Sequence, residues 1–303
     1  MRVAAVVVTY NRKEELYKNI ETVFNQTFVV DRYYVIDNHS DDHTKNYLRG
    51  KGVLDNKAIV YVYLPENIGG AGGFYTGLKK AYEDGYDYIC LMDDDGRPSD
   101  KEMMRIMVEA ADSIYRFKKE FIINALVCGL DGGLSFGLSG GIKTREKAMN
   151  VAEDGMIKGR INPFNGTLVS RELIETIGYP NKDFFIKGDE EDYYRRAKKA
   201  DAFVATIVDA YYYHPTLERI KGRVFTREFS ASTEAPWKEY YRARNYTYMF
   251  KRDGESIKYI RQNIRQIIWA VRYNPQRYRA VAMIVKGWRD GVLGRLGRGA
   301  RPD

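Results

Sequence analysis

Residues 88–96 constrain the fold of this chain most, because they join an apolar run directly to three consecutive aspartates. Residues 88–92 have the composition of a buried strand. A sheet interior would not tolerate three carboxylates, so the acids must lie where the strand ends and the chain reaches solvent. In an open α/β sheet, the carboxyl ends of the strands form the ligand crevice. The pattern therefore predicts acidic side chains at such a crevice.

The three aspartates have different expected directions. Successive side chains at a strand end alternate, so Asp93 and Asp95 are expected to converge while Asp94 points elsewhere. Two convergent carboxylates suit Mg²⁺ or Mn²⁺, which usually complete their coordination with phosphate oxygens. A solvated acidic turn is the alternative, since Gly96 and Pro98 favour a turn in any case. The neighbouring motifs favour the metal site.

The first half of the chain alternates strand and helix signals. Residues 3–8 form a continuous apolar run, as expected for a central parallel strand that is covered on both faces. Asn11 and Ser99 are placed to cap two of the following helices. Further strands are predicted at 33–36, 58–64 and 88–92. This alternation predicts an α/β fold with a Rossmann-like, mostly parallel sheet flanked by helices.

Charge and cysteine content limit the class of protein. The net charge of the 303 residues is +8, and residues 255–303 account for all of it with eleven Lys and Arg against three acids. A neutral body disfavours nucleic acid as a partner. Cys90 and Cys128 lie in apolar runs, which predicts buried thiols in a reducing compartment. Because we find no signal peptide and no run of about 18 apolar residues, we expect a cytoplasmic protein, soluble or peripheral.

Polar or glycine-rich segments also follow the other strands, at residues 9–12, 37–41 and 67–74. Thr9 and Arg12 lie where backbone amides and a guanidinium can meet a base and phosphates. Asp37 can accept hydrogen bonds from a base or ribose. The glycines of 67–74 let the backbone approach a ligand just before a helix N-terminus, which favours negative charge. Each signal alone is weak, but their ordered occurrence points to a sugar nucleotide.

These motifs resemble those of family 2 of the inverting glycosyltransferases, which have the GT-A fold. The resemblance covers about residues 1–250 and rests on VVVTYNR, VIDNHSDD, NIGGAGGF and LMDDD, of which the last two are most similar to bacterial galactofuranosyltransferases. It implies that Asp93 and Asp95 bind Mn²⁺ or Mg²⁺. The expected donor-binding residues are Thr9, Asn11, Arg12, Asp37, Asn67, Gly70, Gly72, Gly73 and Asp94.

Residues 184–193, FFIKGDEEDY, are similar to the family segment that contains the catalytic base. The family has a tryptophan and paired aspartates where this chain has Gly188, Asp189 and Glu190. By position, Glu190 inherits the role of base and Asp189 a role in orienting the acceptor, while the missing tryptophan points to a different acceptor. The alternative is a helix N-terminus enriched in acids, which the helix dipole would stabilise without catalysis.

Two further motifs gain meaning from the resemblance. A single histidine after an aromatic run, such as His214, is more often structural, but the family places a metal-binding histidine here. With Asp93 and Asp95 it would form an O/O/N set suited to Mn²⁺. Residues 240–245 resemble the family's YYxxRN helix, in which aromatic rings can stack on sugars and Arg244 can pair with phosphate. Core packing explains many of these aromatic residues equally well.

The C-terminal tail, residues 251–303, predicts basic amphipathic helices. Apolar residues with helical spacing run from Ile257 to Val271, and Lys and Arg take other positions. Such helices suit an anionic membrane surface, which would place the protein at the inner face of the cell membrane. The alternative is a helix pair that packs on the domain or on another subunit.

The sequence therefore predicts a metal-dependent inverting hexosyltransferase that moves a sugar from a UDP-sugar, first of all UDP-galactofuranose, to a bacterial surface glycan or lipid-linked acceptor. A rhamnosyltransferase using dTDP-rhamnose is the first alternative. A nucleotide-sugar-binding component of a polysaccharide assembly complex, without turnover, is the second. The glycosyltransferase domain is expected at 1–250, with its nucleotide-sugar half at 1–120 and its acceptor and catalytic half at 121–250.

Overall fold

The computed structural model describes residues 1–216, 220–224, 227–231 and 233–301. The chain divides into two compact units. The first contains Met1–Pro180 and Tyr193–Thr216, and the second contains Asn181–Asp192 and Leu217–Asp303. Within the described residues, no helix combines the length and the apolar character that crossing a bilayer requires. The domain boundary predicted at residue 250 stays a prediction.

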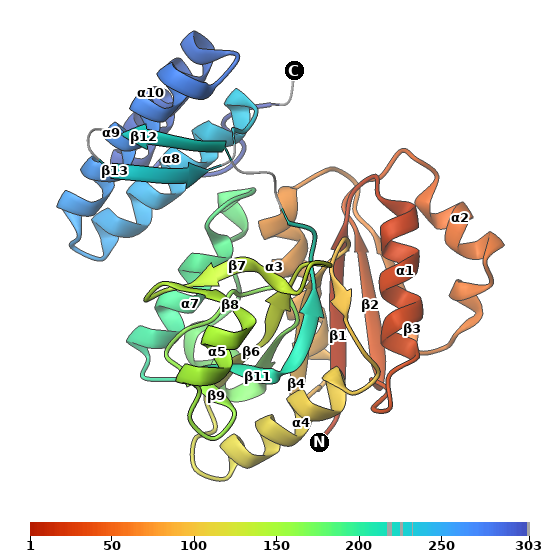
Figure 1. The fold of residues 1–303 in the computed structure, drawn as a ribbon. Coiled ribbons are helices and arrows are strands. Elements are labelled where there is room, and N and C mark those ends of the chain that lie inside the picture. The colour runs from red at the N-terminus through yellow and green to blue at the C-terminus, as the bar shows by residue number, and fades with distance from the viewer. Residues whose placement is uncertain (217–219, 225–226, 232, 302–303) are drawn as a thin grey trace. The chain divides into compact units, whose positions relative to one another are not determined.

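The first unit is built on a mixed sheet whose strands follow the order β3-β2-β1-β4-β10-β6-β11-β5 (Figure 1). β1 pairs in parallel with β2 and β4, and β2 with β3. The parallel core predicted from the sequence is therefore confirmed. It ends at β10, which runs antiparallel between β4 and β6. The strands are β1 (Val3–Thr9), β2 (Arg32–Asp37), β3 (Ile59–Tyr63), β4 (Tyr88–Asp93), β5 (Arg97–Pro98), β6 (Phe121–Cys128), β7 (Gly133–Leu138), β8 (Ile142–Thr144), β9 (Met156–Lys158), β10 (Thr167–Ser170) and β11 (Phe203–Tyr213).

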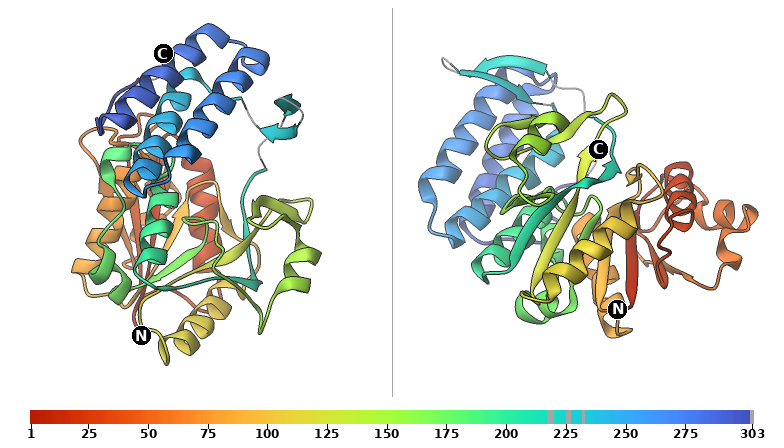
Figure 2. Two further views of the ribbon diagram at one scale, coloured as in Figure 1. Left: turned by 90° about the vertical axis from the view of Figure 1, so that its left-hand side faces the viewer. Right: turned by 60° about the horizontal axis from the view of Figure 1, so that its bottom comes forward.

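Helices cover both faces of this sheet (Figure 2). Side chains of α1 and α4 share one core with alternate residues of β1, and those of α3, α6 and α7 share the other. Every residue of β1 is buried, which explains its unbroken apolar sequence. The helices and helical turns are α1 (Lys13–Phe24), α2 (Thr44–Gly50), η1 (Val53–Asp55), α3 (Gly69–Glu83), α4 (Met103–Tyr115), α5 (Arg145–Val151), α6 (Arg171–Ile177), η2 (Lys182–Phe184) and α7 (Asp189–Lys199).

The two predicted helix caps are wrong. The N-cap position of α1 is Arg12, and the Asn11 side chain instead accepts a hydrogen bond from the Asp41 N–H at 2.9 Å. Helix α4 begins only at Met103, because Ser99 lies in the bend directly after β5, where its N–H donates to the Tyr211 carbonyl at 3.0 Å. Asn11 thus joins the loop after β1 to the loop after β2, and Ser99 joins the segment after β5 to β11. The predicted burial of Cys90 and Cys128 as free thiols is confirmed.

Among its described residues, the second unit contains η2, the start of α7, a hairpin and the helices α8 to α10, so the prediction of helices in residues 251–303 is confirmed. The hairpin strands and these last helices are β12 (Ile220–Val224), β13 (Arg227–Ala231), α8 (Pro236–Arg252), α9 (Ser256–Tyr273) and α10 (Arg277–Val292). Glycines let α10 approach α8 very closely: a Cβ on Gly287 would lie 2.3 Å from the Tyr240 carbonyl oxygen, and one on Gly291 would lie 2.4 Å from that of Arg244. Larger residues at either position would force the two helices apart.

Candidate active site

The carboxyl ends of β1, β2 and β4 meet at one edge of the first unit. In the parallel register, Thr9 lies beside Asp37, and Val8 lies beside Asp93. This arrangement follows from the strand order alone, since neighbouring parallel strands that end together bring their last side chains together. The acidic run that follows β4 therefore lies at the crevice where the sequence predicted it.

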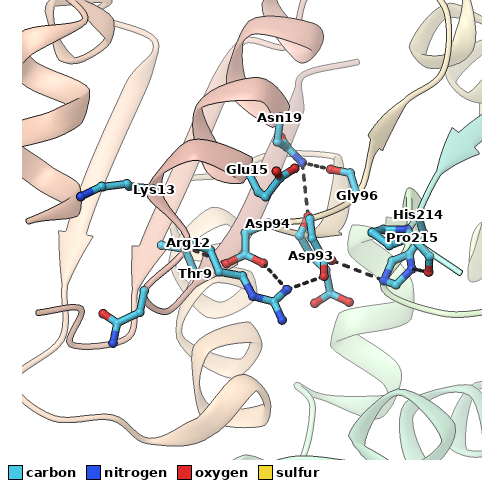
Figure 3. Close-up of polar contacts among 12 residues, drawn as sticks. Thr9, Arg12, Lys13, Glu15, Asn19, Asp93, Asp94, Gly96, His214 and Pro215 are labelled. Atoms are coloured by element: carbon cyan, nitrogen blue, oxygen red, sulfur yellow. Dashed lines mark hydrogen bonds and ion pairs between the residues drawn. The ribbon is translucent and has the colours of Figure 1, made fainter. Parts of the chain in front are cut away.

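Asp93, Asp95 and His214 converge at this edge. Figure 3 labels Asp93 and His214 of this group. One potential ligand atom of each lies within 4.8 Å of the other two, and all three residues are partly buried. The His214 Nε2 is 3.4 Å from an Asp95 carboxylate oxygen. Two of these residues flank the end of β4, and the third directly follows β11. The structure thus brings together the three metal ligands that the resemblance implied.

The His214 ring is held in an orientation that suits a metal ligand. Its Nδ1 lies 2.8 Å from the Pro215 carbonyl oxygen, and its ring packs on Phe136 with the ring centroids 4.8 Å apart. The Ser135 hydroxyl donates to the His214 carbonyl at 2.6 Å. When Nδ1 carries the proton and donates it to Pro215, the lone pair of Nε2 faces Asp95. Metal-binding histidines are usually oriented by such a bond, and the O/O/N donor set fits Mn²⁺ or Mg²⁺.

Asp94 points away from this group, as the alternation along the chain predicts. Its buried carboxylate accepts hydrogen bonds from the Thr9 hydroxyl at 2.8 Å and from the Arg12 guanidinium at 3.3 Å. Burial raises the pKa of Asp94 to about 6, although Arg12 and the Thr9 hydrogen bond act in the opposite direction. Arg12 also forms an ion pair with Asp95, and about half of its side chain stays exposed. Roles for these residues in donor binding stay predictions.

Asn19 is a component of the site that sequence reasoning missed. It is fully buried on α1, and its side-chain amide donates to the carbonyls of Gly96 at 2.5 Å and Asp93 at 3.3 Å. Its side-chain oxygen accepts a hydrogen bond from Tyr33 at 2.5 Å. Asn19 therefore fixes the turn that carries the acidic run. The sequence did contain a signal for this role, because Asn19 is a polar residue among the apolar residues on the buried face of α1.

The loop after β2 is fixed to the start of α3 by side-chain hydrogen bonds. The Asn38 amide donates to the Asn67 side-chain oxygen at 3.0 Å, and that oxygen also accepts the Gly69 N–H at 2.9 Å. Asp37 is buried and already accepts hydrogen bonds from the Ser40 N–H at 2.8 Å and from the Tyr61 hydroxyl. The predicted contact of Asp37 with a base or ribose stays a prediction.

The glycines of 67–74 have two kinds of surroundings. A Cβ on Gly73 would lie 2.4 Å from a Val8 methyl carbon, and one on Gly72 would lie 2.6 Å from the Ile68 side chain. Gly73 therefore permits close packing of α3 against β1, and Gly72 permits close packing against Ile68 at the start of α3. A Cβ on Gly70 would meet nothing within 4 Å. Only Gly70 of these three leaves open space in which a ligand can approach the backbone.

The acidic residues predicted to act in catalysis lie at the start of α7, in the second unit. The Gly188 N–H donates to the Glu190 carboxylate at 3.0 Å, and the φ of Gly188 is +90°, a conformation that favours glycine. Asp189 is buried, whereas Glu190 is only partly buried. Lys187 also has a positive φ, at 66°, so the chain turns sharply just before the acids. Such strained conformations persist only where the surroundings enforce them.

Arg244 and Asn245 on α8 enforce this turn. The Asn245 amide donates to the carbonyls of Phe184, Ile186 and Lys187 at 3.0, 2.9 and 2.7 Å. Arg244 is fully buried and donates to the Phe184 carbonyl at 2.9 Å. The interpretation that Arg244 pairs with phosphate is wrong, because its donors are directed at backbone carbonyls inside the unit. The sequence revealed the motif of residues 240–245 but not its role in holding this turn.

Comparison with known proteins identifies the family. A model of the family described as "Glycosyl transferase family 2" matches residues 4–116. Galactofuranosyltransferase GlfT1 of Mycobacterium tuberculosis is 30% identical over 260 residues, which cover 83% of each chain. GlfT1 of Mycolicibacterium smegmatis is 29% identical and covers 83% of this chain and 84% of its own. The chain belongs to glycosyltransferase family 2.

Solved structures show the same fold for this glycosyltransferase. S. aureus TarS 1–349 in complex with UDP-GlcNAc has a TM-score of 0.60 at 15% identity, covering 96% of this chain and 82% of that chain. Mannosyltransferase PcManGT from Pyrobaculum calidifontis, in complex with GDP-Man and Mn²⁺, has a TM-score of 0.59 at 13% identity, covering 97% and 88%. These structures confirm the predicted GT-A fold, and membership of the family confirms the assignment as a hexosyltransferase-type enzyme.

Proposed function

We propose that this glycosyltransferase transfers galactofuranose from UDP-galactofuranose to a bacterial surface glycan or lipid-linked acceptor, in a metal-dependent reaction that inverts the anomeric centre. The two relatives named galactofuranosyltransferase support the choice of donor sugar. The convergence of Asp93, Asp95 and His214 is the observation that carries the metal dependence. We also propose that the enzyme is cytoplasmic and acts at the inner face of the membrane.

The first unit supplies the donor site in this proposal. Asp93, Asp95 and His214 would hold Mn²⁺ or Mg²⁺, which when bound neutralises negative charge on the diphosphate leaving group. Arg12 already contacts Asp95, and its half-exposed guanidinium can add a second positive charge beside the diphosphate. Asp94 keeps Arg12 and the end of β1 in place through its two hydrogen bonds.

Glu190, at the start of α7, supplies the base in this proposal. Glu190 accepts the proton of the acceptor hydroxyl as the acceptor oxygen bonds to the anomeric carbon. The bond from that carbon to the diphosphate oxygen breaks, and its electron pair leaves with the diphosphate. The greater exposure of Glu190 supports this choice over Asp189, because an acceptor hydroxyl must reach the carboxylate. Asp189 is then left to orient the acceptor from a buried position.

Release of nucleoside diphosphate from a panel of sugar nucleotides tests the proposal. We expect release from UDP-galactofuranose, its loss in EDTA and its recovery with Mn²⁺. Faster release from dTDP-rhamnose would overturn the donor assignment and identify a rhamnosyltransferase. Full activity in EDTA would overturn the metal assignment. Binding of donors without any release, with a range of glycan acceptors present, would identify a non-catalytic binding protein.

A further inference from the structure

Helix α9 exposes an apolar stripe to solvent. Ile257, Ile260, Ile264 and Val271 are 64%, 39%, 41% and 49% exposed. Their spacing places them along one side of the helix, and we call these four residues the outer stripe of α9. A helix on the surface of a soluble domain ordinarily turns its apolar side to the core. The orientation of α9 is therefore unusual.

The opposite side of α9 is the side that packs, and it does so partly through polar groups. The Asn263 amide donates to the Thr247 hydroxyl at 2.8 Å, and the Gln266 amide donates to the Glu239 carboxylate at 2.5 Å. Both amide side chains are buried, as is Trp269. These contacts determine which side of α9 faces α8. The outer stripe thus stays exposed because the protein anchors the helix by its other side.

Basic residues accompany the outer stripe. Lys258, Arg261, Arg265 and Arg272 are exposed, and helical spacing places them on the side adjacent to the stripe. Helix α9 contains no acidic residue. An apolar strip beside a row of cations is the arrangement of helices that lie in a membrane interface, with apolar side chains among acyl chains and cations near anionic headgroups.

We propose that the outer stripe of α9 docks this protein on an anionic lipid bilayer. The charge pattern favours lipid over a second copy of the chain, because a two-fold contact through this face would bring two basic rows together. The inference rests on the membrane location in the proposed function and names the surface that makes the contact, but it does not depend on the transfer reaction. The tail helices α9 and α10 pack on α8, and the proposal adds that the face of α9 left exposed by this packing contacts lipid.

Sedimentation of the 303-residue chain with vesicles tests this proposal. One set of vesicles contains phosphatidylcholine alone, and a second contains phosphatidylcholine mixed with phosphatidylglycerol. We expect binding to the anionic vesicles that weakens as salt is added, and much weaker binding to the neutral ones. Neither donor nor metal is present, so failure of this test is distinguishable from failure of the proposed reaction.

Substitutions in α9 distinguish the contribution of the apolar outer stripe to vesicle binding from that of the basic residues beside it. Ile260→Glu and Ile264→Glu should each weaken binding about tenfold or more, since each removes an apolar side chain from the acyl region. Lys258→Gln and Arg261→Gln should each weaken it about fivefold. Met149→Glu, at an exposed apolar residue of α5 in the first unit, is the matched control and should bind as the unchanged protein does. Thermal unfolding checks that each variant folds.

Several results would overturn the proposal. Equal binding by the stripe variants and the control would show that the stripe does not contact lipid, and equal binding to both kinds of vesicle would remove the role of charge. A protein that is dimeric in solution and becomes monomeric with Ile264→Glu would identify an interface between copies. If a glutamate variant fails to fold, the two exposed basic substitutions still decide the outcome.

Discussion

Two acidic segments of this glycosyltransferase are positioned by different means. Asp93 is the last residue of β4 and Asp95 follows it, and the register of β4 with β1 is continuous, so the sheet itself determines where they lie. Asp189 and Glu190 follow a sharp turn that is held by side chains of α8, a helix more distant in the sequence. The position of the first acidic segment thus follows from backbone pairing, whereas the position of the second depends on a few buried side chains. Substitutions should affect the two segments differently.

The largest effect is expected for Asp95→Ala. Loss of a metal ligand removes stabilisation of the leaving group, so nucleotide release should fall by about 10³-fold or more, and UDP binding with Mn²⁺ should weaken. Release assays and calorimetric titration with UDP measure both. Glu146→Ala, at an exposed acid of α5, is the control and should change neither. Unchanged UDP binding by Asp95→Ala in Mn²⁺ would contradict the metal site.

Glu190→Gln tests the chemistry of the second acidic segment. Removing the base should lower kcat by about 10²–10⁴-fold with little change in donor KM, because the amide keeps its size and loses its basicity. Asp189→Asn should raise acceptor KM more than it lowers kcat. Steady-state kinetics with both substrates measure these changes, and Glu191→Gln serves as the control. A larger loss of kcat in Asp189→Asn would make Asp189 the base.

Asn19→Ala tests how far the sheet alone positions the first acidic segment. The amide supports the turn through two carbonyls, so its loss should weaken Mn²⁺ affinity by about 10- to 100-fold, as for other residues that support metal ligands. Titration of Mn²⁺ in the presence of UDP measures this affinity. Asn19→Ala with unchanged affinity would show that backbone pairing suffices.

Asn245→Ala is the corresponding test for the second segment. Loss of three hydrogen bonds to the turn should lower kcat by about 10- to 100-fold through misplacement of the acids, and leave UDP binding unchanged. Asn263→Ala is the matched control, since it also removes a buried amide of this unit but one that bonds to Thr247. Both should lose about 1–3 kcal/mol of unfolding free energy. An equal kcat in the two variants would show that the role of Asn245 is only structural.

The sequence predicts the fold and the first acidic segment well, for a physical reason. Unbroken apolar runs in β1 and β4 identify parallel strands covered on both faces, and polar residues at their ends must then meet. It predicts the second segment less well, because the contacts of Asn245 with Phe184, Ile186 and Lys187 involve carbonyl groups, which every residue has. No side-chain pattern reveals which carbonyls an amide will contact. The same reason explains why Asn19 was missed.

The last residues of the chain complete the surroundings of the second acidic segment. Arg244 donates to the Gly297 carbonyl, and the Tyr241 hydroxyl, whose ring stacks on Phe185, donates to the Ala300 carbonyl at 2.8 Å. Arg244 and Tyr241 are both fully buried, so loss of these carbonyls would remove acceptors from two buried donors, which lowers the free energy of unfolding. Deletion of residues 297–300 would therefore loosen the support of the Phe185 turn, while the strand pairing that positions Asp93 and Asp95 would stay unchanged.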